Sequence, residues 1–169
     1  KIVGSIYVKE GQNLMDGGPC VIYMHGNASS QLEGQFLVPQ FCPMGVAVYC
    51  FDFSGCGESE GDFISLGYYE KQDVEYLMWF LNSSFNLGPF ALWGRSMGAA
   101  TSVLARGPLI ASIIVDSTFT SINEICAAIG KSQKLPSIAI PAVLWVLKRL
   151  VSGKAGFDMN EVSPLEAAK

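Results

Sequence analysis

The sequence contains a single histidine and no concentrated run of lysine or arginine in its 169 residues. Its formal net charge is -4, so it lacks the basic footprint of nucleic-acid-binding proteins and the polybasic patch that holds proteins on anionic lipid. Its longest apolar segment, Ile138 to Leu147, is interrupted by Pro141 and falls short of the ~20 residues that span a bilayer. These absences argue against a nucleic-acid partner. They do not indicate membrane contact, and a peripheral membrane location stays open as an alternative.

The sequence also has no Cys-x-x-Cys pair among its five cysteines. The lone histidine, His25, has no second ligand at a usable spacing, so we expect neither a metal nor a cofactor. Cys20 and Cys50 stand in apolar runs, where cysteine acts as a small hydrophobic residue. We therefore expect free thiols and a cytoplasmic location, the alternative being a secreted protein with one or two disulfides.

Hydrophobic patterning indicates the fold class. Short apolar runs bounded by glycine, proline or polar residues predict four strands, and helical spacing predicts segments between and after them. Continuous apolar strands that alternate with helices are typical of a parallel sheet covered on both faces, so the predicted fold class is α/β. The predicted strands are 19–24, 46–51, 89–93 and 110–115, and the predicted helices are 30–42, 69–81, 96–106 and 122–129.

Polar residues follow each predicted strand at its carboxyl end. His25, Gly26 and Asn27 follow the first strand, and Asp52, Ser96 and Asp116 follow the next three in turn. In parallel sheets these ends share one edge, where ligands bind. We therefore expect these residues to converge there on a functional site.

The run Gly94-Arg95-Ser96-Met97-Gly98 supplies the candidate chemistry. Gly-x-Ser-x-Gly is a weak signal alone, but here it follows a predicted strand and opens a helix of small residues. That context is typical of a nucleophile elbow, in which a tight strand-to-helix turn exposes the serine. Ser96 is the candidate nucleophile, and the N–H groups of Met97 and Asn27 are the expected oxyanion donors.

Three segments, 23–28, 51–59 and 93–99, resemble landmarks of the α/β-hydrolase superfamily in order and spacing. The sequence is most similar to the branch that contains serine-aminopeptidase-like, monoacylglycerol-lipase-like and protein-depalmitoylase-like hydrolases. The resemblance implies an α/β-hydrolase fold that is incomplete at its C-terminal end. It also implies that His25, Gly26 and Asp52 organise the oxyanion loop without reacting. The expected division is a core at 1–135, a cap or lid at 136–160, and at 161–169 the start of a connection to further strands.

A serine nucleophile needs a base to take its proton. The family places that histidine and its acid near the carboxyl end, and this sequence offers only His25. We expect a piece of a longer chain, the alternative being a natural degenerate hydrolase. Asp116 is a weaker candidate for the acid; its other interpretation is a cap for the next helix, near 117–120. Arg95 is interpreted as a substrate contact or a structural ion pair.

The predicted function is hydrolysis of an ester, thioester or amide through an acyl-enzyme on Ser96, with a small-molecule, acyl or peptide substrate. The segment by itself is expected to be inactive. A catalytically inactive binding domain is the main alternative. A third hypothesis is that the piece cannot fold alone, because a sheet without its last strands leaves an apolar edge exposed. Trp145 and its apolar neighbours would line an acyl pocket, touch a membrane or pack as a cap helix, and the oligomeric state stays open.

Overall fold

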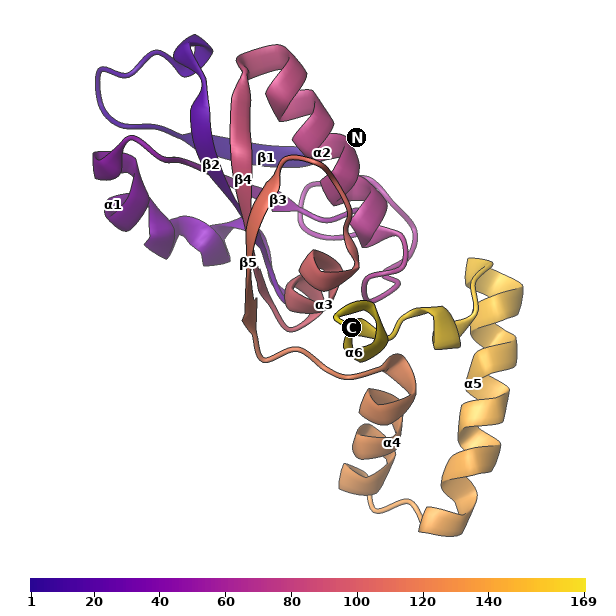
Figure 1. The fold of residues 1–169 in the computed structure, drawn as a ribbon. Helices are drawn as coiled ribbons and strands as arrows, with labels where there is room; N and C mark the ends of the chain where they lie inside the picture. Colours follow the sequence, from indigo (N-terminus) through magenta and orange to yellow (C-terminus); the bar gives the residue numbers. More distant parts are fainter.

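The computed structural model describes residues 1–169 and contains one five-stranded sheet in the order β1-β3-β2-β4-β5 (Figure 1). Only β1 runs antiparallel to its neighbour, and the other neighbouring strands are parallel. The predicted α/β fold with a mostly parallel sheet is confirmed. The strands are β1 (Val3–Tyr7), β2 (Gly18–Met24), β3 (Ala47–Asp52), β4 (Leu87–Arg95) and β5 (Ile110–Asp116).

Apolar cores lie on both faces of the sheet. On one face, helices α2 (Glu70–Phe85) and α3 (Met97–Leu104) join β2, β3 and β4 in a cluster of 17 buried residues. On the other face, a 3₁₀ segment (Gln31–Leu37) and α1 (Val38–Phe41) cover a smaller cluster that includes Val21 and Cys50. Strands β2 and β3, in the middle of the sheet, are therefore buried from both sides.

The segment expected to form a helix at 30–42 is instead mostly 3₁₀. Pro39 has no N–H, so an α-helix that continued through it would lose a hydrogen bond to the residue one turn earlier. The segment also packs closely against the sheet at Gly34, where a Cβ would lie 2.6 Å from the Cys50 sulfur. The prediction of a regular helix was wrong here because backbone chemistry outweighed the apolar spacing.

Strand β1 was not predicted from the sequence. It pairs antiparallel with β3, with Val3 opposite Asp52 and Tyr7 opposite Val48. Ile2, Ile6 and Val8 pack against the larger core. Their even spacing is the period-two signal of a half-buried strand, and it could have identified this element.

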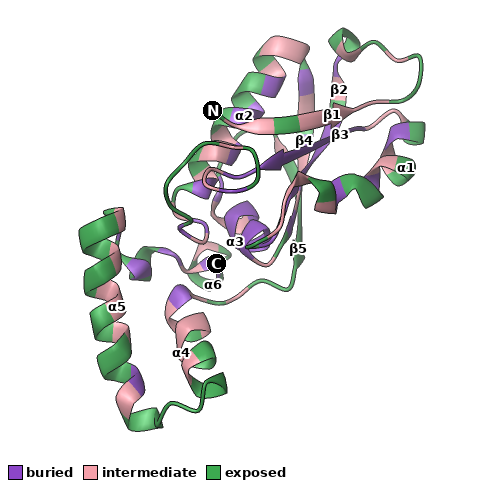
Figure 2. Cartoon of the chain, turned by 180° about the vertical axis from the view of Figure 1, so that it is seen from behind, coloured by how far each residue is buried: buried purple, intermediate pink, exposed green.

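Helices α4 (Ile122–Ser132) and α5 (Ile140–Ala155) form a hairpin, here called the α4–α5 arm, which extends away from the sheet (Figures 1 and 2). Its base packs on a third buried cluster that contains Ile122, Phe157 and Val162. The hydroxyl of Tyr69 donates a hydrogen bond to the Ala155 carbonyl at 2.7 Å. The short helix α6 (Pro164–Ala167) then returns to α3.

None of the helices combines the length and the apolar character that crossing a bilayer requires. The five cysteines are unpaired. Burial raises the pKa of the Cys20 and Cys50 thiols to about 12, so both stay protonated and apolar at neutral pH.

Strand β5 lies at the edge of the sheet and leaves apolar side chains exposed. Ile113, Ile114 and Val115 are 42%, 37% and 43% exposed. An open, apolar edge strand invites pairing with another chain, which is the hazard behind the third hypothesis.

We predict that Ile114→Lys lowers the aggregation of the 169-residue chain, because a lysine on an edge strand opposes edge-to-edge pairing. Static light scattering at matched concentration measures this, and thermal melting should show little loss of stability. Ile22→Lys, in the fully buried centre of the sheet, should instead unfold the protein. Unchanged light scattering in Ile114→Lys would show that the chain does not aggregate through β5.

Candidate active site

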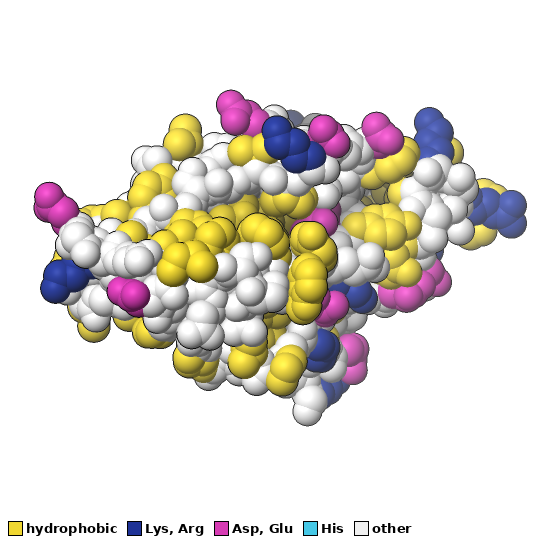
Figure 3. All heavy atoms as spheres, turned by 90° about the horizontal axis from the view of Figure 1, so that it is seen from above, with side chains coloured by type: hydrophobic (Ala, Val, Ile, Leu, Met, Phe, Trp, Pro, Cys, Tyr) yellow, Lys and Arg dark blue, Asp and Glu magenta, His cyan; other side chains and the backbone are white.

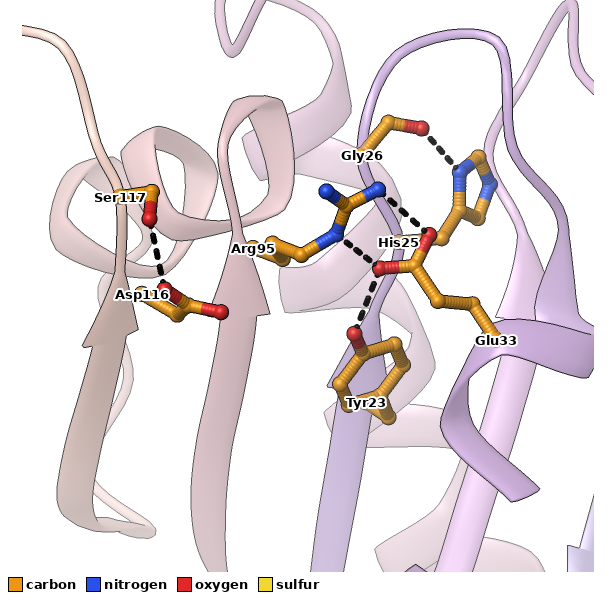
Figure 4. Close-up of polar contacts among 7 residues, drawn as sticks. All are labelled: Tyr23, His25, Gly26, Glu33, Arg95, Asp116 and Ser117. Atoms are coloured by element: carbon orange, nitrogen blue, oxygen red, sulfur yellow. Dashed lines mark hydrogen bonds and ion pairs between the residues drawn. The ribbon is translucent and has the colours of Figure 1, made fainter. Parts of the chain in front are cut away.

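The predicted convergence of polar residues occurs at the carboxyl edge of the sheet. Strands β2, β4 and β5 are parallel neighbours, so the residues after β2 and β4 lie beside the end of β5 (Figure 4). Asp52 ends β3 on the other side of β2. The sheet order therefore gathers the candidate residues from segments that are far apart in sequence.

Ser96 has the backbone geometry of a strained turn. Its φ is 51° and its ψ is -109°, a region that residues with a side chain rarely adopt. Its N–H donates to the Asp116 carbonyl at 2.8 Å, and its own carbonyl accepts from the Ala100 N–H at 3.0 Å. The turn is thus fixed to β5 on one side and to the first turn of α3 on the other.

The two glycines that flank Ser96 make this turn sterically feasible. A Cβ on Gly94 would lie 2.1 Å from the Gly98 carbonyl oxygen, and a Cβ on Gly98 would lie 2.0 Å from the Met24 carbonyl oxygen. Real Cβ atoms do not approach backbone so closely, so α3 can sit against β2 and β4 only if both positions lack side chains. The Gly-x-Ser-x-Gly spacing is therefore a packing requirement here.

The two expected oxyanion donors follow β2 and β4, which are parallel neighbours in the sheet. Met97 is the first residue of α3, where helix N–H groups have no acceptor one turn earlier, and its side chain is buried. Asn27 is exposed in the turn after β2, next to Ala28 at a φ of 58°. Their assignment as oxyanion donors stays a prediction.

Asp52 ties the loop after β2 to the loop after β3. Its carboxylate accepts hydrogen bonds from the Gln31 N–H at 2.7 Å, the Gln31 side-chain amide at 3.1 Å and the Glu58 N–H at 3.1 Å. A Cβ on Gly57 would lie within 2.3 Å of the carboxyl carbon. Asp52 is buried and engaged on both oxygens, which suits a residue that fixes loops.

His25 is fully buried, and both of its ring nitrogens are engaged. Nδ1 lies 2.7 Å from the Gly26 carbonyl oxygen, and Nε2 lies 3.2 Å from the Phe53 backbone nitrogen. The carbonyl can only accept and the N–H can only donate, so these partners assign the proton to Nδ1. The ring also packs edge-on against Phe53, with centroids 5.1 Å apart. His25 therefore offers no free nitrogen to take a proton from Ser96.

Arg95, beside the candidate nucleophile, pairs with Glu33 (Figure 4). Its Nη2 donates to one Glu33 oxygen at 3.3 Å, and its Nε donates to the other, which also accepts from the Tyr23 hydroxyl at 2.8 Å. Of the two interpretations of Arg95, the structure contains the ion pair. Glu33 and Tyr23 were not identified from the sequence, because residues 62 and 72 positions from Arg95 give no spacing signal.

This cluster shifts the titration of its members. Burial opposes ionisation of Glu33, but hydrogen bonds from Arg95, Ser29 and Tyr23 outweigh it and lower the pKa of Glu33 to about 2. Burial, followed by the hydrogen bond to Glu33, raises the pKa of Tyr23. The hydrogen bond to Glu33 likewise raises the pKa of Arg95. The carboxylate and the guanidinium therefore stay charged throughout the physiological range.

Asp116 lies with this cluster in a groove of about 830 Å³. Neither Ser96 nor Asn27 lines that groove. The Asp116 carboxylate accepts a hydrogen bond from the Ser117 hydroxyl at 2.7 Å. Helix α4 begins at Ile122 and is capped by the side chain of Ser121, so the interpretation of Asp116 as a helix cap was wrong. Asp116 as a catalytic acid stays a prediction, because no histidine is available for it to orient.

Solved structures of low sequence identity share the fold of this chain. An esterase from Pyrococcus furiosus superposes with a TM-score of 0.63 at 21% identity, over 94% of this chain and 65% of its own. A monoacylglycerol lipase from Paleococcus ferrophilus gives a TM-score of 0.57 at 18% identity, over 78% of this chain and 50% of its own. At these identities the likeness shows the fold alone, which is the α/β-hydrolase fold.

The chain belongs to the serine aminopeptidase (S33) family of serine hydrolases in this superfamily, which matches residues 18–156. The YqkD protein of Bacillus subtilis is 28% identical over 86% of this chain and 48% of its own length. The lysophosphatidylserine lipase ABHD12 of Danio rerio is 30% identical over 63% of this chain and 29% of its own length. The chain thus spans half or less of the length of these relatives.

The lowered pKa of Glu33 predicts a pH-dependent contribution to stability. A carboxylate whose folded-state pKa lies below its ordinary value of 4.5 stabilises the protein above pH 4.5 and loses that effect as the pH falls toward 2. Arg95 is half-exposed, so we expect a screened contribution of about 1 kcal/mol. Urea unfolding of wild type and Glu33→Gln should therefore differ by more at pH 5 than at pH 3.

The matched control is Arg95→Met, in which the partner is absent. Adding Glu33→Gln to that background should give a stability difference that changes less between pH 5 and pH 3. An equal change in both backgrounds would mean that the Arg95 pair does not cause the shift.

Proposed function

We propose that Ser96 is the nucleophile of a serine hydrolase that cleaves an ester, thioester or amide through an acyl-enzyme. The observation that carries this proposal is the strained backbone of Ser96 between two glycines that admit no side chain. Such strain persists only where the surroundings impose it, and it gathers at functional sites. Family membership supports the same chemistry.

In the proposed reaction the Ser96 oxygen attacks the carbonyl carbon while its proton passes to a base. The carbonyl oxygen becomes an oxyanion, which the N–H groups of Met97 and Asn27 would stabilise. The leaving group departs with a proton returned by the base, and water then releases the acyl group in the same way. His25, Gly26 and Asp52 would hold the Asn27 loop in position without touching the substrate.

The base must be a group other than His25, whose two nitrogens are committed to Gly26 and Phe53. We therefore propose activity for a protein that supplies another histidine to Ser96, and inactivity for the 169 residues by themselves. The competing proposal is a catalytically inactive binding domain, and the commitment of the sole histidine is the observation that favours it.

We further propose that the α4–α5 arm is the cap of the enzyme. The sequence division assigned α4 to the core and 136–160 to the cap, yet α4 packs against α5. The arm, the 63–66 loop, Phe157 and Met159 line an open apolar pocket of about 330 Å³, a size and character that suit an acyl group. A relative is named a lysophosphatidylserine lipase, and ferulic acid is bound in a structural neighbour. We therefore propose an acyl ester as the substrate.

The unpaired thiols support a reducing, cytoplasmic location.

A fluorophosphonate probe tests the proposal, because it reacts only with an activated serine. We expect labelling of the natural protein that contains these residues, and loss of that labelling in Ser96→Ala. The 169-residue chain should label at least about tenfold more slowly, since general-base assistance contributes about 10²–10⁴-fold.

Ser102→Ala is the matched control, because Ser102 lies on the same helix but is fully buried. It should label like wild type. Equal labelling of wild type and Ser96→Ala would exclude Ser96 as the nucleophile. A natural protein that folds but does not label would favour the inactive binding domain.

A further inference from the structure

The tip of the α4–α5 arm, residues 129–138, exposes aliphatic side chains. Ile138 is 91% exposed, Ile129 is 54% exposed and Leu135 is 39% exposed. The tip is nonetheless folded, since the N–H groups of Gln133, Lys134 and Leu135 all donate to carbonyls at the end of α4. The tip lies at the far end of the arm from the sheet (Figure 1). A structured, projecting loop thus holds aliphatic groups in water, where they are unfavourable.

Nearly all charged side chains of the arm are positive. Residues 122–155 contain five cations, namely Lys131, Lys134, Lys148, Arg149 and Lys154, and a single carboxylate, Glu124. The rest of the chain holds six cations and fourteen carboxylates. The cations are spread over two helices and a loop, so no basic run marks them in the sequence. The fold gathers them on one projection of an otherwise acidic protein.

Two lysines of this set lie at the tip itself. Lys131 and Lys134 are exposed, and neither forms an ion pair. The single carboxylate of the arm is at its base, where Glu124 accepts a hydrogen bond from Thr120. Exposed hydrophobic side chains occur elsewhere too, and Figure 3 shows patches of them across the face seen from above. Acidic and basic side chains both lie around that face, whereas the charged residues of the tip are both lysines.

This combination fits a lipid surface better than a protein partner. The three aliphatic side chains of the tip itself offer far less area than the roughly 800 Å² that each partner buries in a stable protein complex. The other exposed apolar side chains of the arm lie farther along α5, at Val143, Trp145, Val146 and Leu150. Aliphatic groups that enter the boundary between headgroups and acyl chains, flanked by lysines near the phosphates, are a recognised mode of interfacial binding. The negative remainder of the chain would be repelled by an anionic bilayer, which selects an approach with the arm foremost.

We propose that the tip of the α4–α5 arm docks on anionic membranes. Leu135 and Ile138 insert below the headgroups, and Lys131 and Lys134 contact the lipid phosphates. This surface is separate from the Ser96 site, so the inference holds whether or not Ser96 is a nucleophile.

Co-sedimentation with lipid vesicles measures the docking. One set of vesicles is phosphatidylcholine alone, and the other contains about 30% phosphatidylserine, on the order of anionic inner leaflets. Wild type should bind the anionic vesicles and bind the neutral ones weakly. Leu135→Asp with Ile138→Asp, and Lys131→Glu with Lys134→Glu, should each lower binding about tenfold or more. Ile138→Trp should gain a blue-shifted emission when anionic vesicles are added.

Matched controls make the same chemical changes far from the arm. Met44→Asp alters a side chain that is 74% exposed beside the sheet, and Lys9→Glu alters an exposed cation after β1. Both should bind like wild type, and all variants should keep the wild-type circular dichroism spectrum. No binding by folded wild type would overturn the proposal, as would equal losses in the arm and control variants. If wild type self-associates, does not bind vesicles, and loses self-association in the arm variants, the tip is an interface between two copies of this chain and the membrane proposal is overturned.

Discussion

The close approach of helix α3 to strand β2 is the contact on which the candidate site depends. It occurs at Gly98, whose backbone lies directly against the Met24 carbonyl, and it brings the first turn of α3 over the edge of the sheet. With the helix so near, the chain leaving β4 has room only for a sharp reversal at Ser96. The strain of Ser96 is therefore a consequence of packing between two elements, offset by the burial of α3 against the sheet.

The surroundings of the turn are held by charged and polar groups that are fully occupied. Asp52 spans two loops, His25 bridges Gly26 and Phe53, and Glu33 neutralises Arg95. Each of these groups has its partners, which is the condition under which burying a polar group does not destabilise the fold. The same occupancy limits chemistry, because a histidine with two engaged nitrogens cannot also accept the proton of Ser96. The turn at Ser96 is thus surrounded by groups whose hydrogen bonds are already made.

Local patterns were sufficient to predict β2 to β5, α2 and α3, because each is a continuous apolar run or a clear helical stripe. They also placed Ser96, Asn27 and Asp52 at one edge, since parallel topology follows from alternation of strands and helices. The Glu33–Arg95 pair could not be predicted, because it depends on the path of the 3₁₀ segment Gln31–Leu37. The role of Asp116 as a helix cap failed because α4 starts at Ile122, where its spacing predicts it, and the side chain of Ser121 caps it.

The most direct test of the imposed strain compares Ser96→Gly with Ser96→Ala in urea unfolding. Glycine adopts a φ of 51° without penalty, whereas alanine keeps the steric conflict. Ser96→Gly should therefore be more stable than Ser96→Ala by about 1 kcal/mol or more. At Ser102, inside the same helix, the order should reverse, since glycine weakens a helix interior by about 1 kcal/mol relative to alanine. Greater stability of alanine than glycine at both positions would contradict the account.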